Sequence, residues 1–556
     1  MTVFRTASRR HLLVESADLA ASMQLNHALE AAALPGVVEL VPAARTVLIR
    51  FDPARTSAPA LEEAISGLDV TDSATGSGRT VTIDVRYDGE DLAEVADLLG
   101  VSPAEVVARH QRARWEVAFS GFAPGFGYLA GDDPLFDVPR RSTPRTRVPV
   151  GAVGLAGEFT GVYPRASPGG WQLIGHTDAV LWDLDRQPPA LFVPGTIVTF
   201  VDAGMASARA AETHASAESA AASLADGTPS AAEAPSSAGA SSAESSASHS
   251  LTVIEPGLQL LIEDLGRPGF ASMGVSSAGA ADRSALVDAN CLVGNAESAA
   301  VLESFGGGVS LCVTGDGVAA VTGAGGPITV TAADGTVFGH RLGEAFSLVD
   351  GDKLELGPTE TGVRRYLAVR GGIIADTALG SASADTLAHL GPAALTTGDT
   401  IDLGEPMTAP HLVDPGPRLG ADRVLPAPGG LVELTVTLGP RDDWFTSAGI
   451  DTLLTQEWTV THESDRVGLR LAGEVPLERA RTGELPSEGA VTGALQVPPN
   501  GQPVLFGPDH PLTGGYPIIA SVDDTDLAAQ LPPGVRIRFR TAAAADSTSS
   551  DPSDES

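Results

Sequence analysis

The sequence predicts an α+β protein that is mainly β, with a ferredoxin-like unit at the N-terminus followed by β-barrel domains. Three observations support this fold class. The first 85 residues alternate strand and helix patterns in the order β-α-β-β-α-β. Most of the remaining chain consists of short apolar runs separated by glycine and proline, which is typical of all-β domains. The chain has 556 residues, 43% of them hydrophobic, and is therefore long enough for several cores.

Residues 1–85 are the predicted ferredoxin-like subdomain. The pattern predicts strands for HLLVE, VVELV, TVLIRF and TVTIDVRY, because each is a short run rich in β-branched or aliphatic residues. It predicts helices for ADLAASMQLNHALEAAAL and APALEEAISGL, which are too long and too rich in alanine and leucine to be strands. The order of these segments is that of a split β-α-β unit.

Residues 86–204 are predicted to form a β-barrel preceded by a short helix. Ser102, Pro103 and Glu105 have the spacing of a capping box with proline at the first helical position, so a helix should run to about Arg112. Beyond it, WEVAFSGF, VGAVGLAG, WQLIG and TIVTFV are short strands between glycines and prolines. A closed or nearly closed barrel is expected.

A tether separates this part from a second one. Residues 205–250 consist mainly of Ala, Ser, Gly and Pro and are predicted to be a disordered linker, and the tail 542–556 has the same composition. Residues 251–425 are predicted as a first β-barrel subdomain and 426–541 as a second one. One helix interrupts the strands, with Asp282 as its cap and Gly294 as its end.

Charge and hydropathy exclude several classes of function. The formal net charge is −35 and no cluster of basic residues stands out, so nucleic acid is not an expected partner. No apolar run approaches the length of a membrane-spanning helix, and the N-terminus reaches Glu15 before a secretory apolar region develops. A cytoplasmic protein without a membrane partner is expected.

The single lysine, Lys353, removes further possibilities. It is preceded by Asp352 and followed by Leu354, so there is no phosphate-binding P-loop, and no Met-Lys-Met type turn could carry biotin. The sequence also has no HExxH, GxSxG, CxxC or GxGxxG motif, and no metal site is predicted. Its two cysteines, Cys291 and Cys312, cannot form a multi-bridge framework.

The residues most suggestive of binding lie between 119 and 177. FSGFAPGFGYL and GVYPRASPGGWQLIGHT combine aromatic rings with glycine and proline, so that backbone amides can approach a ligand whose apolar parts pack on the rings. The loop between them, PRRSTPRTRVP, contains Arg140, Arg141, Arg145 and Arg147, whose guanidinium groups suit a carboxylate or phosphate. The same pattern is also expected if the glycines only turn a tight barrel, the rings fill it and the arginines are solvated.

The order of these motifs resembles a known family. FAPGFGYL, PRRSTPRTRVPVGAVGLAGEFTGVYP and SPGGWQLIGHT resemble the B subunit of bacterial 5-oxoprolinase, also called the Kip inhibitor or allophanate hydrolase subunit 1 family. IEDLGRPGFASMGVSSAGAADRSALVDANCLVGN, SEGAVTGALQVPPNGQPVLF and DHPLTGGYPIIA resemble the C subunit of that enzyme, the Kip antagonist or allophanate hydrolase subunit 2 family. The resemblance covers nearly the whole chain except the linker and tail. The same modules are similar to the carboxyltransferase portion of urea carboxylase in the urea amidolyase family.

The resemblance implies a fused B–C protein with cyclophilin-like barrels. Its implied activity is the ATP-dependent opening of 5-oxo-L-proline, a small lactam acid, to L-glutamate together with a separate A subunit of the LamB/YcsF type. ATP with Mg²⁺ is implied as a co-substrate by the family alone, and carried biotin is not implied. Assembly into a homo-oligomer stays open. The alternatives are a Kip-type regulator that binds a sensor histidine kinase, and a carboxyltransferase acting on urea or a related amide.

The resemblance also implies which residues form the site. Arg141 and Arg145 are catalytic candidates that would hold a phosphate or carboxylate, and Glu488 and Asp509 are the catalytic candidates of the second half. The substrate-binding candidates are Phe122, Pro124, Phe126, Tyr128, Tyr163, Ser167, Gly169, Gly170, Trp171, Gln496, Gln502, Thr513, Gly514, Gly515 and Tyr516.

Several of these residues have a structural alternative. Gln496 and Gln502 could instead stabilise the turn from Pro498 to Gly501, an explanation that is favoured for Gln502. Asp264 and Arg267 could form a salt-bridged turn. The family commonly has Gln-Thr-Thr-Gly-Gly-Tyr-Pro where this chain has Pro511 and Leu512 before Thr513, and this departure leaves the identity of the substrate open.

Overall fold

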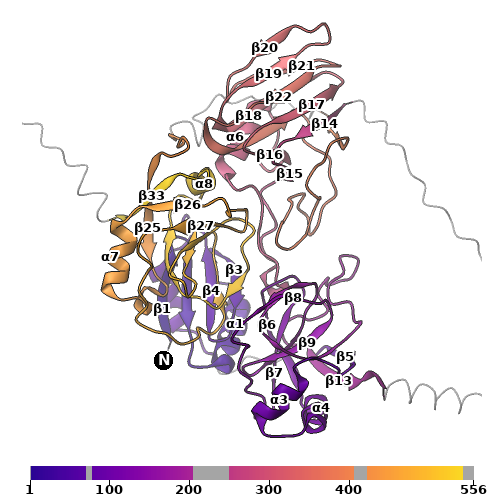
Figure 1. Cartoon of the computed structure of the whole chain (residues 1–556), viewed down its shortest axis with the longest axis vertical. Helices are drawn as coiled ribbons and strands as arrows, with labels where there is room; N and C mark the ends of the chain where they lie inside the picture. Colours follow the sequence, from indigo (N-terminus) through magenta and orange to yellow (C-terminus); the bar gives the residue numbers. More distant parts are fainter. Residues whose placement is uncertain (1, 71–77, 205–248, 406–422, 543–556) are drawn as a thin grey trace, which may run out of the picture.

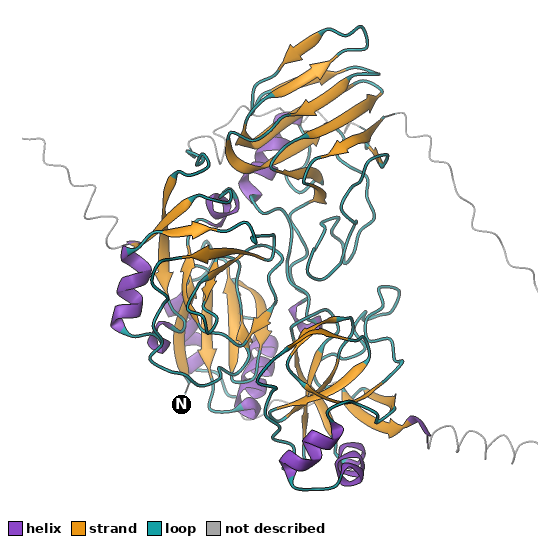
Figure 2. Cartoon of the chain, viewed as in Figure 1, coloured by secondary structure: helices purple, strands orange, loops and turns teal. Residues whose placement is uncertain are grey.

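The computed structural model describes residues 2–70, 78–204, 249–405 and 423–542 (Figure 1). Residues 2–204 are called the first half below, and residues 249–542 the second half. Residues 205–248 of the predicted linker and 543–556 of the predicted tail lie outside the described residues. Strands predominate throughout (Figure 2), as the sequence predicts. Within the described residues, no helix is both long enough and apolar enough to cross a lipid bilayer.

The N-terminal sheet has four strands in the order β1-β2-β4-β3, with two helices on one face. Its elements are β1 (Val3–Ser8), β2 (His11–Glu15), α1 (Leu19–Ala32), β3 (Val37–Pro42), β4 (Thr46–Phe51) and α2 (Ala58–Ser66). Leu12 and Val14 point to the helices, whereas Leu13 points to the opposite face, which is also buried. Burial on both faces explains why this strand is a continuous apolar run instead of an alternating one.

The predicted ferredoxin-like order of strands is wrong for its last strand. The strand predicted to complete the unit, β5 (Thr80–Val85), leaves the N-terminal sheet and pairs in parallel with β13 (Ile197–Asp202). The edge of β2 that it would need is occupied by β1, which forms a hairpin with β2. The sequence VFRTAS has few apolar residues, so this edge strand is not visible as a strand in the sequence.

The first barrel is a seven-stranded sheet in the order β12-β9-β10-β7-β6-β13-β5. Its two end strands are joined by a bridge between Arg86 and His176, which nearly closes the barrel as predicted. Ser102 caps α4 through its side chain, which accepts a hydrogen bond from the amide of Glu105. The further elements are α3 (Leu92–Leu99), α4 (Pro103–Arg112), β6 (Trp115–Ser120), β7 (Gly127–Gly131), β9 (Ala152–Ala156), β10 (Phe159–Val162), β12 (Gln172–His176) and the ribbon of β8 (Arg145–Val148) with β11 (Ser167–Gly169).

The region predicted as a first barrel of the second half is a sandwich of two sheets around one core. One sheet contains β20 (Val337–Gly339), β19 (Ile328–Thr331), β22 (Lys353–Leu356), β17 (Val309–Thr314), β14 (Ser250–Pro256) and β24 (Thr400–Asp402). The other contains β15 (Gln259–Glu263), β16 (Val301–Phe305), β23 (Thr361–Val369), β18 (Gly317–Gly325) and β21 (Ala345–Leu348). The chain passes from β14 to β15 through Gly257, whose φ of +68° suits glycine, and the two strands enter different sheets. Helix α6 (Arg283–Val293) packs on this sandwich with the predicted cap and end.

The C-terminal barrel is closed, as predicted. Its strands are β25 (Leu431–Leu438), β32 (Ile518–Val522), β29 (Ala494–Gln496), β30 (Val504–Phe506), β27 (Gly468–Ala472), β26 (Trp458–Val460) and β33 (Arg536–Thr541). It is accompanied by η2 (Asp442–Trp444), α7 (Ser447–Thr455), α8 (Thr525–Ala529) and the ribbon of β28 (Glu488–Gly489) with β31 (Thr513–Gly514).

The two halves share a hydrophobic core although they lie far apart in sequence. The N-terminal sheet packs on the C-terminal barrel, where Leu13 and Leu48 join Ala494 and Ile518 in one buried cluster. Figure 1 shows the indigo N-terminal strands beside the orange and yellow barrel. The first barrel meets the second half at η1 (Ala271–Met273). We call the contact between the halves the seam.

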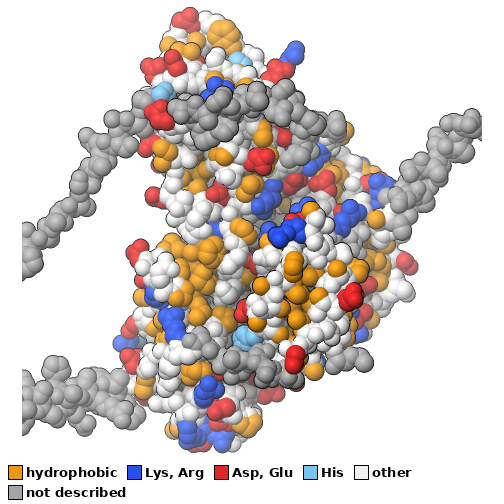
Figure 3. Space-filling view, turned by 180° about the vertical axis from the view of Figure 1, so that it is seen from behind, with side chains coloured by type: hydrophobic (Ala, Val, Ile, Leu, Met, Phe, Trp, Pro, Cys, Tyr) orange, Lys and Arg blue, Asp and Glu red, His pale blue; other side chains and the backbone are white. Residues whose placement is uncertain are grey.

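The surface is not uniformly acidic despite the net charge of −35. Figure 3 shows the molecule from behind, with apolar side chains over broad areas of its lower part and basic side chains gathered near the middle beside acidic ones. The protein therefore presents positive charge locally.

Candidate functional site

A cavity of about 130 Å³ lies at the seam and is lined by both halves. We call it the seam cavity. Ten of the residues predicted for substrate binding line it, together with two that the prediction omitted, Arg140 and Ser487. The ten are Phe122, Phe126, Tyr128, Tyr163, Gly169, Gly170, Trp171, Thr513, Gly514 and Gly515. Motifs that are almost 400 residues apart in the chain thus converge on one concavity.

The turn before β7 gives the cavity its first wall. Phe122 has a φ of 63°, a left-handed conformation that is a true outlier for so bulky a residue, and Gly125 follows with a φ of 77°. The turn is held from the second half, because the amide of Gly125 donates to the carbonyl of Met273 at 2.9 Å. Strained backbone of this kind concentrates at binding sites.

The aromatic rings form one connected cluster. Phe126 lies with its ring centroid 5.3 Å from Trp171 and 5.1 Å from Tyr128, in edge-to-face geometry. Tyr163 is 5.4 Å from Phe126. All four rings are buried, so the cluster serves both as core and as the apolar wall of the cavity. The expectation that the rings fill the barrel is therefore confirmed, whereas their role in holding a ligand stays a prediction.

The second half closes the cavity with the β28–β31 ribbon. Ser487, just before β28, is tied to the first half because its carbonyl accepts from the amide of Ala44 at 3.2 Å. The Tyr128 hydroxyl lies beside the side chains of Ser487 and Thr513. Burial raises the pKa of Tyr128, and the positive charge of Arg140 acts in the opposite direction. At neutral pH the cavity therefore presents a neutral phenol and two aliphatic hydroxyls.

The predicted catalytic arginines do not line the cavity. Arg141 and Arg145 both bind the buried carboxylate of Asp91, with N–O distances of 2.7 Å each. Arg145 also binds Glu90 and donates to the carbonyl of Trp171 at 3.4 Å. Their charge is already neutralised, so they support the cavity wall from behind instead of facing a ligand.

Asp91 is the centre of this support and was missed from the sequence. Besides the two arginines it accepts from the amide of Leu173 at 2.6 Å, two residues beyond Trp171. One buried carboxylate thus fixes both the arginine-rich loop and strand β12. No local pattern around Asp91 distinguishes it from the neighbouring Glu90 and Glu94, which remain exposed.

Arg140 is the arginine that reaches the cavity. It is an exposed residue at the cavity edge, and none of the described hydrogen bonds or ion pairs involves it. The sequence identified its loop as an anion-binding candidate. It could not show which of the loop's arginines are paired, because the pairing depends on Asp91 and its neighbours about 50 residues earlier.

The two predicted catalytic carboxylates are also placed away from the cavity lining. Glu488 is held by Arg441, whose Nε lies 2.9 Å from it, and Asp509 is held by Arg466 at 2.9 Å and 3.0 Å. Both carboxylates are buried. They act as anchors of the loops that carry Ser487 and Thr513, instead of facing a ligand.

The remaining predicted residues have structural contacts. Gln502 has structural contacts, but its side chain exchanges hydrogen bonds with the backbone of Gly473 and not with the turn around Pro499 and Asn500. Gln496 lies behind Gly514 and donates to the carbonyl of Tyr516 at 3.4 Å. Pro124, Ser167 and Tyr516 are not part of the lining.

The Asp264–Arg267 segment is a structural turn, but not a salt-bridged one. The carboxylate of Asp264 accepts from the hydroxyls of Ser381 and Ser383 at 2.6 Å each. Arg267 donates to the carbonyl of Ala378 at 3.2 Å.

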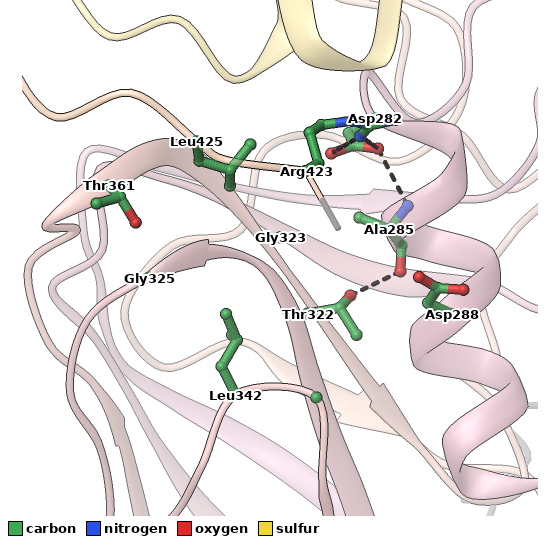
Figure 4. Close-up of a pocket in the computed structure, with 11 residues that line it drawn as sticks. Asp282, Ala285, Asp288, Thr322, Gly323, Gly325, Leu342, Thr361, Arg423 and Leu425 are labelled. Atoms are coloured by element: carbon green, nitrogen blue, oxygen red, sulfur yellow. Dashed lines mark hydrogen bonds and ion pairs between the residues drawn. The ribbon is translucent and has the colours of Figure 1, made fainter. Parts of the chain in front are cut away.

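A larger cavity of about 290 Å³ lies in the second half beside α6 (Figure 4). Two of its lining residues form an ion pair, since Arg423 lies 3.2 Å from Asp282. A third, Thr322, donates its hydroxyl to the carbonyl of Ala285. Burial, and then the nearby Asp526, raise the pKa of Asp282 from 3.8 to about 6. The seam cavity, with its unpaired arginine, is the better candidate site.

The raised pKa of Asp282 gives a testable pH dependence. Because its pKa is higher in the folded state, its contribution to stability is complete below about pH 4 and is lost as the pH rises through about 6. Asp282→Asn stays neutral and still caps the helix. Relative to wild type, the variant should therefore gain about 2–3 kcal/mol in unfolding free energy between pH 4 and pH 7. Urea unfolding of both proteins at four pH values measures this difference, and parallel pH profiles would contradict it.

The two halves match two models of one family. The carboxyltransferase domain, subdomain C and D, matches residues 2–192, and subdomain A and B matches residues 273–541. The B subunit of the Escherichia coli 5-oxoprolinase is 42% identical over 173 residues, which are 30% of this chain and 79% of that protein. The C subunit of the Escherichia coli 5-oxoprolinase is 35% identical over 299 residues, 52% of this chain and 90% of that protein. The crystal structure of TTHA0988 superposes with a TM-score of 0.75 at 32% identity, covering 96% of this chain and 100% of that one.

Proposed function

Because the chain belongs to the carboxyltransferase-domain family, with subdomains C–D and A–B joined in one polypeptide, we propose that it is the fused B–C component of an ATP-dependent 5-oxoprolinase. Relatives named as the B and C subunits of 5-oxoprolinase support this assignment. The observation that carries it is the seam cavity, because residues of both halves line it. A fusion of the two subunits would keep such a shared site assembled.

The cavity suits a small acid with an amide group. Its volume of about 130 Å³ is below the range of pockets for drug-sized ligands, so it fits a compact ring and is too small for a nucleotide. The rings of Phe126 and Trp171 provide flat apolar walls, and the hydroxyls of Tyr128 and Thr513 can bind the lactam. The adenosine part of ATP, with Mg²⁺ on its phosphates, would accordingly bind outside the cavity at a surface shared with the LamB/YcsF-type A subunit, from which the γ-phosphate would reach the lactam oxygen.

The chemistry explains the need for ATP. A lactam carbonyl is a poor electrophile, and transfer of the γ-phosphoryl group to its oxygen makes the ring carbon reactive toward water. Hydrolysis of the ring C–N bond then yields glutamate, ADP and phosphate. The chain's own contribution is to hold the ring against the aromatic wall, to orient the carbonyl and to limit the access of water.

Reconstitution tests this function. The purified chain, a LamB/YcsF-type protein, ATP, Mg²⁺ and 5-oxoproline should together produce glutamate, and omission of any one of them should reduce glutamate to background. Absence of glutamate from the complete mixture would contradict the proposal. Tight binding to a sensor histidine kinase would then favour the regulatory alternative.

A second candidate function is that of a carboxyltransferase acting on urea or a related amide. It is supported by the description of both matching family models as a carboxyltransferase domain. This chain has a single lysine and no biotin-carrying turn, so a biotinylated carrier would have to come from another protein. Carboxylation of urea with such a carrier, in the absence of glutamate formation from 5-oxoproline, would support this candidate.

A further inference from the structure

We propose that Arg140 binds the carboxylate of the ligand in the seam cavity, and that the lack of a side chain at Gly515 leaves room for that carboxylate. The choice of 5-oxoproline as the ligand rests on the proposed function. The role of Arg140 as an anion-binding residue rests on the charges and contacts described below.

The first argument is the charge balance of the cavity. Arg140 is the charged residue among its lining residues, and no aspartate or glutamate lines the cavity. The nearby Arg141 and Arg145 are neutralised by Asp91, whereas none of the described ion pairs involves Arg140. A guanidinium at the cavity edge, without an ion-pair partner among the described residues, is suited to an anionic ligand.

The second argument is the position of the guanidinium. Arg140 Nη1 lies 3.9 Å from the point where a Cβ atom on Gly515 would stand. The guanidinium is also close enough to Tyr128 and Tyr163, which line the same cavity, for its charge to act on both phenols. A carboxylate bound by Arg140 would therefore lie between the first-half rings and Gly515.

The third argument is that the fold does not require glycine at position 515. A Cβ atom there would have its nearest neighbour, the carbonyl oxygen of Leu485, at 3.5 Å, and the backbone is not left-handed. Gly514 differs, because a Cβ atom would lie 2.6 Å from Gln496 Nε2. Gly170 resembles Gly515, with its nearest neighbour at 3.8 Å. At Gly514 that neighbour is the end of a flexible side chain, whereas at Gly515 a methyl group would fit the fold without any shift and would occupy space in the cavity.

The fourth argument is the buried hydroxyl of Thr513, which lines the cavity together with Arg140 and lies beside the Tyr128 hydroxyl. Thr513 is 4% exposed, and its Oγ1 makes no hydrogen bond of standard geometry with the described residues. A buried hydroxyl usually has a partner, so this atom is available to the amide group of a ligand. Arg140 and Thr513 would then bind the two ends of one small molecule, the carboxylate and the lactam.

The experiment is a calorimetric titration of the full chain with 5-oxoproline and with 2-pyrrolidinone, the same ring without the carboxylate. Wild type should bind 5-oxoproline and should bind 2-pyrrolidinone at least 10-fold more weakly. Arg140→Ala should weaken binding of 5-oxoproline by about 10- to 100-fold, and Arg140→Lys by less, because it keeps the charge but loses the planar fork. Gly515→Ala should weaken it by at least about 10-fold through steric exclusion, with an unchanged melting temperature.

Arg147→Ala is the matched control. Arg147 lies in strand β8, which follows the loop of Arg140, and carries the same charge. It does not line the cavity, so its replacement should change the affinity by less than about 2-fold. Equal affinities of wild type and Arg140→Ala, equal affinities for the two ligands, or no binding by wild type would each overturn the inference. If the affinities follow the expected pattern but the reconstituted mixture forms no glutamate, the proposed function fails while the anion site stands.

Discussion

Replacement of Arg466 by alanine is expected to lower the unfolding free energy of the second half by about 3–5 kcal/mol at pH 7. Arg466 is completely buried and lies within 3.2 Å of three carboxylates, those of Glu263, Glu303 and Asp509. Removal of the guanidinium would leave these groups in a desolvated environment with Arg364 as the remaining counter-charge on Glu303. Removal of one partner of a buried ion pair costs far more free energy than the intact pair contributes to stability, because the other charge is left buried and unpaired.

The position of Arg466 explains why the effect should extend beyond one loop. Arg466 and Asp509 belong to the C-terminal barrel, whereas Glu263 and Glu303 lie in strands β15 and β16 of the sandwich. The cluster therefore joins the two subdomains of the second half. Burial raises the pKa of Glu263 well above its usual range.

Guanidinium denaturation monitored by tryptophan fluorescence measures the loss. Arg466→Lys should lose less than Arg466→Ala, because it keeps a charge but cannot reach three carboxylates. The control is Arg536→Ala, which removes a pair of 2.7 Å to Glu457 in which the arginine side chain is 48% exposed, and it should cost about 0–1 kcal/mol. A loss below about 1 kcal/mol for Arg466→Ala would contradict the assigned role.

Replacement of Arg441 by alanine is expected to have an effect of similar size, about 3–5 kcal/mol, but at the seam. Arg441 forms a two-pronged pair with Glu488 and also donates to Glu15 of the first half at 2.9 Å. Glu15 keeps a second partner in Arg5, whereas Glu488 would be left buried and unpaired. Because Glu488 follows Ser487 directly, the loss should also loosen the second-half wall of the seam cavity.

The pH dependence of this variant distinguishes a charge effect from a packing effect. Burial raises the pKa of Glu488 even with Arg441 present, and loss of Arg441 would raise it further. The penalty should therefore be small below the ordinary glutamate pKa of 4.5 and should grow as the pH rises. Unfolding at pH 4 and pH 7 measures the change, with Arg540→Ala as the exposed control. A cost that is equal at both pH values would identify lost packing as the cause.

Local features of the fold were predictable because their partners are close in sequence. Ser102 and Asp282 bind amides three residues ahead, and Gly294 ends its helix through carbonyls of the preceding turn. The partner of a strand is not determined in this way. Strand β5 pairs with β13, more than 100 residues later, and β1 is hidden by its polar sequence.

The candidate site was predictable in its motifs but not in its charges. The rings near Phe126 and the glycines near Gly515 were identified because irregular glycine-rich segments with aromatic residues are unusual in a pure core. The sequence favours Arg141 and Arg145 as anion-binding residues, since it gives no sign that both pair with Asp91 while Arg140 lines the cavity. Glu488 was assigned a catalytic role for the same reason, with Arg441 as the unseen partner.

The sequence by itself determined the β-rich class, the helices with their caps, the family and the segments that meet at the seam cavity. The tertiary structure alone decided that residues 251–402 form a sandwich, that β5 belongs to the first barrel, and that Arg140 lines the seam cavity while Arg141 and Arg145 pair with Asp91. The physical reason is that burial of apolar surface is non-directional, so the same hydrophobic pattern satisfies a barrel or a sandwich. Whether a charged side chain is ion-paired depends on the groups that the folded chain brings within about 4 Å of it, wherever those groups lie in the sequence.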